Sequence, residues 1–328
     1  MIKRFGLIAV MLVLTAVMIL DFKINEPFLR FFESMVEVDL SARSEMQTQT
    51  IEIEEGERFF IEVDESRLNL EPTKKKSLTV TAQSEDAVSV VRSEDGIVLK
   101  VLEGSVATVS LPEAILPQVT AYGASVYVSV NVAEIDARSS YLSLTDVKTG
   151  KIKAADSYVQ LTNSTPEIIE TTRCQLEIAQ AEAKKDQIIL DATETVVNVS
   201  SVALVKGNAQ NSTVSLEYVD EVDLTVTGGT LRVRRTENNL GLHLEGTNAY
   251  LELGDHFSCI TAEESEVTIK MLRTDAELLV ETTGTEISTN VVGAEGLNFS
   301  YVRGKDAKEQ TLKTQGGILR LYSPFVSM

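Results

Sequence analysis

The feature that most constrains the fold is a repeat of 16 to 21 residues that begins near residue 125. Each repeat contains two apolar residues that flank one polar residue. The apolar pairs are Val126/Val128, Leu142/Leu144, Val159/Leu161, Leu176/Ile178, Val197/Val199, Val214/Leu216, Leu231/Val233, Leu251/Leu253 and Val267/Ile269. Side chains alternate between the two faces of a β-strand, so the apolar members should point inward and the polar member outward.

A second, looser apolar pair follows the first within many repeats. These pairs are Ile135/Ala137, Ile152/Ala154, Leu224/Val226, Leu242/Leu244, Leu278/Val280 and Leu297/Phe299. One repeat therefore holds two short strands and two turns, and it is too small to bury its own apolar face. Stacked repeats cover one another with their strands in parallel ladders. We predict an all-β fold, a parallel β-solenoid of about ten coils over residues 112–325.

Turn-forming residues separate the predicted strands. They are expected to tolerate the tight or left-handed backbone of corners. The pairs are Thr149-Gly150, Gly207-Asn208, Gly228-Gly229, Asn238-Asn239 and Thr283-Gly284. An antiparallel sandwich would also show short alternating strands with frequent turns. The regularity of the longer period favours the solenoid.

Residues 45–111 are rich in strand-forming residues but do not share the period. A hairpin is expected over residues 50–63, followed by strands near residues 77–82, 88–91 and 96–102. An uncovered first coil would leave an open strand edge, which promotes aggregation. We therefore predict that residues 45–111 form a β-rich cap at the N-terminal end of the stack.

The N-terminus has the pattern of a membrane anchor. Lys3 and Arg4 precede an apolar run over residues 5–20 that ends at Asp21. This charge order predicts a single-pass transmembrane signal anchor within residues 1–22, with a cytoplasmic N-terminus and the remainder exported. The run is short for a span, so a cleaved signal peptide is the alternative, although no small-residue cleavage site follows it. Residues 23–44 are predicted to form a short amphipathic helix or linker.

Charge and cysteine content exclude some classes of function. The 328-residue chain has a formal net charge of -19, which would repel a phosphate backbone, so no nucleic-acid partner is expected. Its two cysteines, Cys174 and Cys259, form no zinc motif. Several predicted coils separate them, at ~4.8 Å per coil, whereas a disulfide needs α-carbons within about 7 Å. We expect both thiols to remain unpaired.

Four segments resemble a known group of bacterial proteins. They are residues 51–57 (IEIEEGE), 95–101 (DGIVLKV), 106–112 (VATVSLP) and 119–128 (VTAYGASVYV). Together with the coils, they resemble the bacterial β-solenoid domains of unknown function named putative adhesins, similar to the head-GIN putative adhesins. The resemblance covers residues 45–325. It implies a surface or envelope protein, often held by one membrane segment, with no established catalytic residues.

No catalytic, cofactor-binding or metal-binding site is predicted. A glycan-active enzyme on a parallel β-helix would need several Asp, Arg or Lys on one face, but the residues between the inward pairs are mostly Ser, Gln, Asn and Thr. His243 and His256, which follows Asp255, are single histidines without a constellation of Cys or carboxylate residues. Residues 74–76 and the group Arg232, Arg234 and Arg235 form basic islands, which either contact an anionic partner or balance the acidic surface.

Three tyrosines are the candidate contact residues. Tyr141 and Tyr158 precede the inward pairs of neighbouring repeats, and Tyr250 holds the same place before Leu251. Exposed aromatic side chains in a column bind sugar rings or a protein partner. Alternatively, they stabilise the ladder through neighbour contacts.

Taken together, these features predict a non-enzymatic, membrane-anchored scaffold or adhesin-like binding protein of the bacterial envelope. Its bulk would be periplasmic or on the cell surface. Expected partners are the membrane through residues 5–20, an envelope protein or glycan, and a second copy of the chain. One alternative is a structural solenoid subunit that polymerises end to end. The other is a glycan-active β-helix enzyme.

Overall fold

The structure is a computed structural model that describes residues 46–54, 56–180, 187–254, 257–272, 277–290, 298–302 and 309–322. The predicted anchor over residues 5–20 and the helix or linker over residues 23–44 lie outside these residues, as does His256. Within the described residues, the one helical element is a 3-10 turn, η1 (Glu85–Ala87), and no helix is long and apolar enough to cross a membrane. The predicted all-β class is confirmed.

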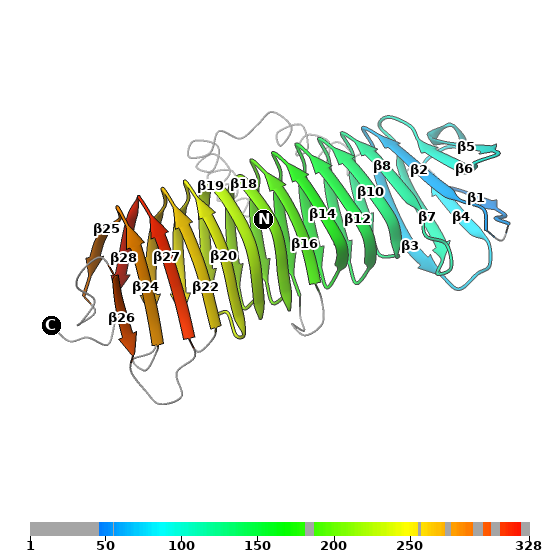
Figure 1. Cartoon of the computed structure of the whole chain (residues 1–328). Helices are drawn as coiled ribbons and strands as arrows, with labels where there is room; N and C mark the ends of the chain where they lie inside the picture. The colour runs from blue at the N-terminus through cyan, green and yellow to red at the C-terminus, as the bar shows by residue number, and fades with distance from the viewer. Residues whose placement is uncertain are drawn as a thin grey trace, which may run out of the picture. The chain divides into compact units, whose positions relative to one another are not determined.

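Most strands belong to two parallel ladders, here named ladder A and ladder B (Figure 1). In stacking order, ladder A contains β6 (Gly96–Val101), β2 (Phe59–Asp64), β8 (Gln118–Tyr122), β10 (Val132–Arg138), β12 (Lys148–Ala155), β14 (Thr165–Thr172), β16 (Gln187–Thr193), the first parts of β18 (Leu204–Glu217) and β19 (Glu221–Arg234), β20 (Asn239–Glu245), β22 (Phe257–Glu263), β27 (Glu309–Gln315) and β24 (Glu277–Thr283). Ladder B contains β7 (Val106–Pro112), β3 (Arg67–Thr73), β9 (Ser125–Val128), β11 (Tyr141–Thr145), β13 (Tyr158–Thr162), β15 (Gln175–Ala179), β17 (Val196–Ser200), the second parts of β18 and β19, β21 (Asn248–Leu253), β23 (Glu266–Met271), β28 (Ile318–Tyr322) and β25 (Glu286–Thr289). Each repeat therefore adds one strand to each ladder.

Antiparallel strands finish the stack. At the N-terminal end, β5 (Val88–Ser93) pairs with β6, β4 (Leu78–Ala82) pairs with β7, and β1 (Gln47–Ile51) pairs with β4. At the other end, β26 (Asn298–Val302) pairs with β24. Within residues 45–111, the strands β1, β4 and β5 pair in antiparallel fashion outside the two ladders. The other four strands, β2, β3, β6 and β7, belong to the parallel ladders. The expected continuation of the repeat at Phe299 was wrong, since β26 runs antiparallel.

The order of strands in the stack departs from the order in the sequence at both ends. The pair β2 and β3 lies between β6 and β7 on one side and β8 and β9 on the other. The pair β27 and β28 lies between β22 and β23 on one side and β24 and β25 on the other. The C-terminal strands thus fill an interior place in the stack. The predicted sequential order was wrong there.

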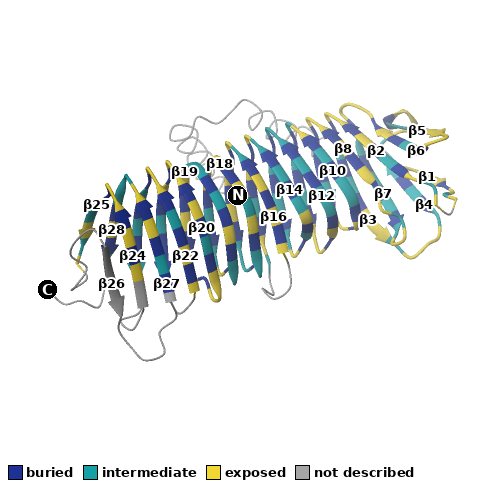
Figure 2. Ribbon diagram, viewed as in Figure 1, coloured by how far each residue is buried: buried dark blue, intermediate teal, exposed yellow. Residues whose placement is uncertain are grey.

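Alternating burial along the strands produces one continuous core between the ladders (Figure 2). In β13, Val159 and Leu161 are fully buried, whereas the alternate residues Tyr158 and Gln160 are partly exposed. The same alternation holds along β11, β15 and β17. Buried apolar area stabilises such a stack at roughly 25 cal/mol per Å². The inward assignment of the apolar pairs is confirmed for these repeats.

One register prediction needs correction. The sequence analysis matched Leu231/Val233 with Leu251/Leu253, but the structure pairs Leu231 with Ala249 and Val233 with Leu251. Ala249, Leu251 and Leu253 all point inward. A shift of two residues leaves the inward and outward alternation unchanged, so the pattern cannot distinguish these two registers.

The corners from ladder A to ladder B use a dipeptide that the sequence analysis missed. The first residue has a left-handed backbone and in many repeats is not glycine, for example Asp156 at φ 51°. The second is a small buried polar residue, for example Ser157, whose Oγ donates to the Ala155 carbonyl at 2.7 Å and accepts from the Ser140 N–H at 3.0 Å. These bonds satisfy backbone groups that a corner would otherwise leave unpaired.

The same dipeptide recurs along the stack. Its other non-glycine examples are Glu65-Ser66, Ser139-Ser140, Arg173-Cys174, Glu194-Thr195, Asn211-Ser212 and Glu264-Ser265. Of the turn pairs expected at corners, Thr149-Gly150 lies within β12 and Gly207-Asn208 within β18. Those two expectations were wrong, because both pairs lie inside strands. Gly228 and Gly284 do have the left-handed backbone expected at corners, with φ of 70° and 64°.

Candidate functional site

The two ladders present outward faces of different chemistry. Between the inward pairs of ladder A, from β8 to β18, the outward residues are Thr120, Asp136, Lys153, Glu170, Asp191 and Asn208. The equivalent outward residues of ladder B are Tyr127, Ser143, Gln160, Glu177, Asn198 and Ser215. Ladder A therefore carries charges of both signs, whereas ladder B carries mainly uncharged hydrogen-bonding groups.

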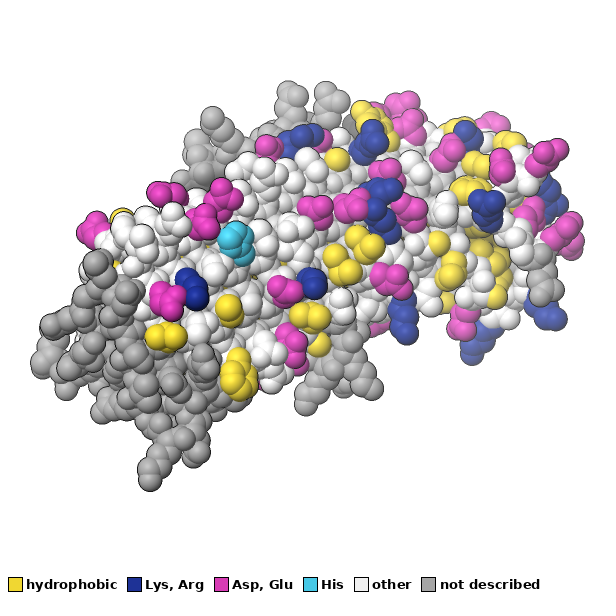
Figure 3. Space-filling model, in the orientation of Figure 1, with side chains coloured by type: hydrophobic (Ala, Val, Ile, Leu, Met, Phe, Trp, Pro, Cys, Tyr) yellow, Lys and Arg dark blue, Asp and Glu magenta, His cyan; other side chains and the backbone are white. Residues whose placement is uncertain are grey.

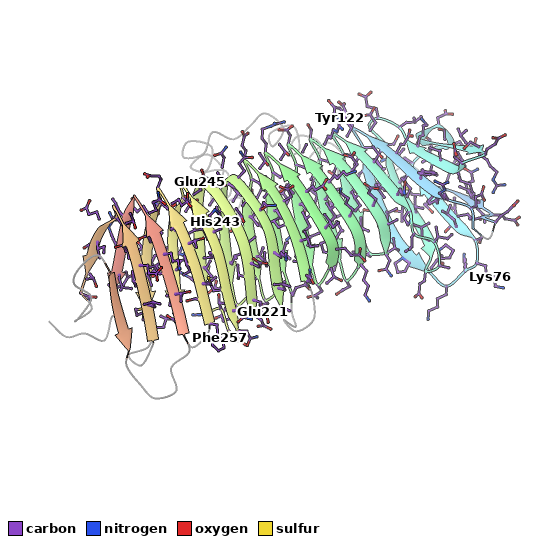
Figure 4. All side chains as sticks on the ribbon, viewed as in Figure 1. Lys76, Tyr122, Glu221, His243, Glu245 and Phe257 are labelled. Carbon is purple, nitrogen blue, oxygen red and sulfur yellow. The ribbon has the colours of Figure 1, made fainter. Side chains whose placement is uncertain are left out.

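Charges on the ladder A face pair with one another. Lys153 Nζ lies 2.9 Å from Glu134 Oε1, and Lys206 Nζ lies 3.2 Å from Asp223 Oδ2. Figure 3 shows acidic and basic side chains next to one another on this side of the stack. His243, which is labelled in Figure 4, lies on the same side. Exposed pairs of this kind contribute about 0–1 kcal/mol each. They balance the local charge of this face.

Tyr141 and Tyr158 are register partners on neighbouring strands of ladder B, as predicted. Their rings stack with centroids 5.3 Å apart at an interplanar angle of 7°, and Tyr127 contacts the other side of Tyr141 at 5.6 Å and 50°. Tyr141 thus has a ring neighbour on each side along the stack, and the Arg67 guanidinium lies 4.7 Å from the centroid of the Tyr127 ring. Stacking of this kind stabilises the ladder, and what remains for a partner is the ring edges and hydroxyl groups.

The hydroxyl groups of these tyrosines are held by polar neighbours. Tyr158 Oη donates to Glu177 Oε2 at 2.6 Å, and Tyr141 Oη donates to Gln160 Oε1 at 3.1 Å. Burial raises the pKa of both phenols, and the Glu177 hydrogen bond raises that of Tyr158 further. Both hydroxyls therefore keep their protons at neutral pH and retain lone pairs that accept hydrogen bonds.

Tyr250 does not continue the column of Tyr141 and Tyr158. It pairs with Arg232 and Thr268, which places it in the column of Tyr127, two residues along the strand from the expected position. This follows from the register correction above. The Arg232 guanidinium lies 5.6 Å from the centroid of the Tyr250 ring, within the range of a cation–π contact.

Tyr250 also belongs to a group that includes the C-terminal strand β28. Its hydroxyl lies 3.3 Å from that of Tyr322. Burial is the main cause that raises the pKa of Tyr250 to about 12, and the hydrogen bond with Tyr322 adds to it. The insertion of β28 next to β23 brings Tyr322 to this place, so the sequence offered no signal for the contact.

Four basic residues surround this tyrosine pair. Arg232 and Arg234 come from β19, Lys270 from β23 and Arg320 from β28. Lys270 Nζ lies 3.2 Å from Glu252 Oε1, and Arg320 pairs with Glu266. Among the described residues, neither Arg232 nor Arg234 forms an ion pair. The third arginine of the predicted island, Arg235, turns away to the Tyr218 ring at 4.6 Å and to Glu217 at 3.5 Å.

The remaining candidates stand apart from this group. His243 is exposed on ladder A, where its Nδ1 lies 2.7 Å from Thr261 Oγ1. Cys174 is buried in the corner column, Cys259 is exposed, and both are unpaired as expected. Residues 74–76 lie in the exposed turn after β3. The part of the chain that the structure describes holds no group of three or more His, Cys, Asp or Glu suited to a metal ion.

A groove of about 740 Å³ lies on the strands β22, β27 and β24 of ladder A. It contains the exposed Lys313–Glu281 ion pair, at 3.0 Å, with Thr261 and Gln315 nearby. Glu281 raises the pKa of Lys313 through their hydrogen bond. The described part of the groove thus presents a paired charge rather than a general base next to a nucleophile.

Comparison with known proteins gives similar structures but no family. No protein-family model matches the chain, and no curated protein matches it. The chain is similar to the solved structure of a putative cell adhesion protein from Clostridium sporogenes, with 9% identity, 86% of this chain and 100% of that chain covered, and a TM-score of 0.20.

Two further solved structures are putative adhesins from Parabacteroides. The one from Parabacteroides merdae has 14% identity, covers 85% of this chain and 97% of its own, and gives a TM-score of 0.38. The one from Parabacteroides distasonis has 12% identity, covers 85% of this chain and 98% of its own, and gives a TM-score of 0.26. These structures carry the adhesin description that the sequence resemblance implied. At this level of similarity, they do not assign the chain to a family.

Proposed function

We propose that the chain is a non-enzymatic, adhesin-like binding or scaffold protein of the bacterial envelope, and that its outward ladder B face is the binding surface. In this proposal the two ladders form a β-solenoid, and residues 5–20 anchor it in the membrane with the stack outside the cytoplasm. The parallel register of both ladders supports the solenoid. The charge order around Lys3, Arg4 and Asp21 supports the anchor.

The observation that carries the proposal is the difference between the two faces of one stack. Ladder A carries outward charges of both signs, several of which pair with each other. Over β9 to β18, ladder B places Tyr, Gln, Asn and Ser between its inward pairs, with Glu177 as the one carboxylate of that column. A flat surface of amide, hydroxyl and phenol groups offers donors and acceptors without the desolvation cost of a charge. Such a surface suits a hydroxyl-rich polymer such as a glycan.

The regular spacing of the ladder supports recognition of a repeating polymer. Neighbouring strands lie ~4.8 Å apart, so equivalent polar groups recur at that interval along the face. An extended polymer that lies across the strands can make similar contacts with successive repeats. Many weak contacts of this kind sum to useful affinity when one chain engages them together.

A second candidate, end-to-end polymerisation, is favoured by the edge of β1. This strand pairs with β4, and no other described strand pairs with it. Its sequence, QTQTI, has no charge, and four of its five residues are exposed. An uncharged exposed edge is a template for strand addition by another chain. A concentration-dependent increase in mass that Thr48→Pro abolishes would favour this candidate.

Selective blocking of each face tests the binding proposal. In the full-length Cys259→Ser chain, Ser143→Cys on ladder B or Lys153→Cys on ladder A is coupled to a bulky maleimide polymer. Cys174 stays unlabelled because it is buried, and burial raises the pKa of its thiol. Co-sedimentation with envelope fragments of the producing bacterium is then measured.

We expect the polymer at position 143 to abolish co-sedimentation and the polymer at position 153 to leave it unchanged. Equal loss from both positions, or loss from position 153 alone, would show that ladder B is not the binding face. Protease treatment of spheroplasts tests the anchor separately. It should remove the stack, whereas a mature N-terminus between residues 19 and 25 would show that the anchor is cleaved.

A further inference from the structure

The fold brings together basic and aromatic side chains that are distant in the sequence. Arg232, Tyr250, Thr268 and Arg320 occupy successive register positions across β19, β21, β23 and β28 of ladder B. Lys270 and Tyr322 form a second registered pair beside them. This group, which we name the basic cluster, consists of Arg232, Arg234, Tyr250, Lys270, Arg320 and Tyr322. It extends the ladder B face toward the C-terminal end of the stack.

The basic cluster has an excess of positive charge on a strongly acidic protein. Three carboxylates lie next to its four cations: Glu252 and Glu266 pair with Lys270 and Arg320, and Glu217, the register partner of Arg234, pairs with Arg235 outside the cluster. Arg232 and Arg234 have no carboxylate partner among the described residues. These two arginines lie two residues apart on one strand of a chain whose net charge is -19.

Contacts with neighbouring rings orient one of the two arginines. The contact with the Tyr250 ring limits the positions of the Arg232 guanidinium, and the Tyr322 hydroxyl in turn fixes Tyr250. Arg234 Nε is buried and has no hydrogen-bond partner among the described residues, so this donor is not used within the described part of the chain. Guanidinium groups bind carboxylate and phosphate oxygens through two parallel hydrogen bonds. Less side-chain entropy is lost on binding when the group is held in advance.

We propose that the basic cluster binds an oxyanion of an acidic polysaccharide that lies along ladder B. Arg232 and Arg234 donate to the carboxylate or phosphate of the polymer, and the Tyr250 and Tyr322 hydroxyls contact adjacent polar groups. The inference rests on the proposed function, because it assumes that ladder B is the binding face. It adds the charge class of the ligand and the residues that select it.

The net charge of the chain gives this site a distinctive salt response. The acidic body repels an anionic polymer at long range, and this repulsion is screened over about 8–10 Å at moderate ionic strength. Contacts at the cluster are shorter than this length and are screened less. Affinity should therefore hold or rise between low and moderate salt, unlike the steep fall expected for a purely basic protein surface.

Binding of defined polymers to the full-length chain in an uncharged polyoxyethylene detergent tests the proposal. The probes are polygalacturonate for carboxylate, poly(glycerol phosphate) for phosphate, neutral dextran, and vesicles containing phosphatidylglycerol. The variant is Arg232→Ala/Arg234→Ala. The matched control, Lys151→Ala/Lys153→Ala, removes two cations at the same spacing from one strand of ladder A.

We expect one or both acidic polymers to bind the native chain, and the arginine variant to bind at least about tenfold more weakly. The lysine control should bind like the native chain. The conservative variant Arg232→Lys/Arg234→Lys should recover part of the affinity, because it restores charge without the bidentate geometry. Thermal unfolding of each variant verifies that the fold persists.

Three outcomes would overturn the inference. They are equal binding of dextran and the acidic polymers, equal weakening by the lysine control, and binding to the anionic vesicles alone. None of them decides whether ladder B is the binding face, since that is measured by blocking position 143. If blocking position 143 abolishes envelope binding while the arginine variant does not weaken it, only the acidic-polymer inference fails.

Discussion

The interior place of the C-terminal strand β28 leads to a strong prediction about Leu319. This side chain is fully buried, with 0% exposure, and lies in register between Val267 of β23 and Ile287 of β25. Leu319→Ala removes three carbons, worth about 2.4 kcal/mol at ~0.8 kcal/mol each. The cavity left between two packed neighbours raises the expected loss in the free energy of unfolding to about 3–5 kcal/mol.

The neighbouring residue Arg320 is the matched control. Its side chain points outward and forms an exposed ion pair with Glu266. Arg320→Ala should therefore cost no more than about 1 kcal/mol. Urea unfolding of both variants measures the difference. A cost for Leu319→Ala close to that of Arg320→Ala would mean that the terminal strand frays freely and does not occupy the interior of the stack.

Hydrogen exchange separates the inserted order from a sequential one. Because β28 lies between β23 and β25, Leu319→Ala should raise exchange in residues 266–271 and 286–289 alike. A sequential stack would place residues 286–289 against 266–271 and leave the latter protected. Faster exchange confined to residues 286–289 would therefore refute the inserted order.

Three further predictions follow from the described contacts. Leu216→Asp places an unpaired charge in the core and should lower the free energy of unfolding by several kcal/mol. Ser215→Asp faces water and should change it by no more than about 0.5 kcal/mol. Denaturant unfolding measures both, and equal costs would disprove the inward assignment. Cys174→Ser keeps an acceptor for the Ser157 N–H and should leave thermal unfolding nearly unchanged. Cys174→Val leaves the Ser157 N–H without an acceptor and should lower the free energy of unfolding by about 1–3 kcal/mol. Since burial raises the pKa of Tyr250 to about 12, the stability it contributes is complete below pH ~10 and is lost as the pH rises through 12. Tyr250→Phe should reduce the alkaline loss of stability in urea titrations, and the part due to Tyr141 and Tyr158 should remain.

Much of the candidate face could be predicted from local pattern. Tyr141 and Tyr158 were expected in one column because each directly precedes an apolar pair, and the structure places them so. Their stacking could not be foreseen, because the sequence does not report ring orientation. Arg232 and Tyr250 were both noted as candidates, but their contact was missed. It depends on a register that is two residues away from the one the apolar pattern suggested.

The sequence by itself determined the strand class, the two strands per repeat and the inward faces, since these follow from alternation at a period of two. Tertiary structure alone decided which strands are neighbours. Stacked repeats present similar apolar faces to each other, so a shift of two residues keeps the same side chains pointing inward. For the same reason, the alternation is compatible with β27 and β28 lying between the pair β22 and β23 and the pair β24 and β25. The meeting of Tyr322 with Tyr250 results from that choice. Partner selection depends on side-chain fit and edge pairing across the whole stack, which no local stretch encodes.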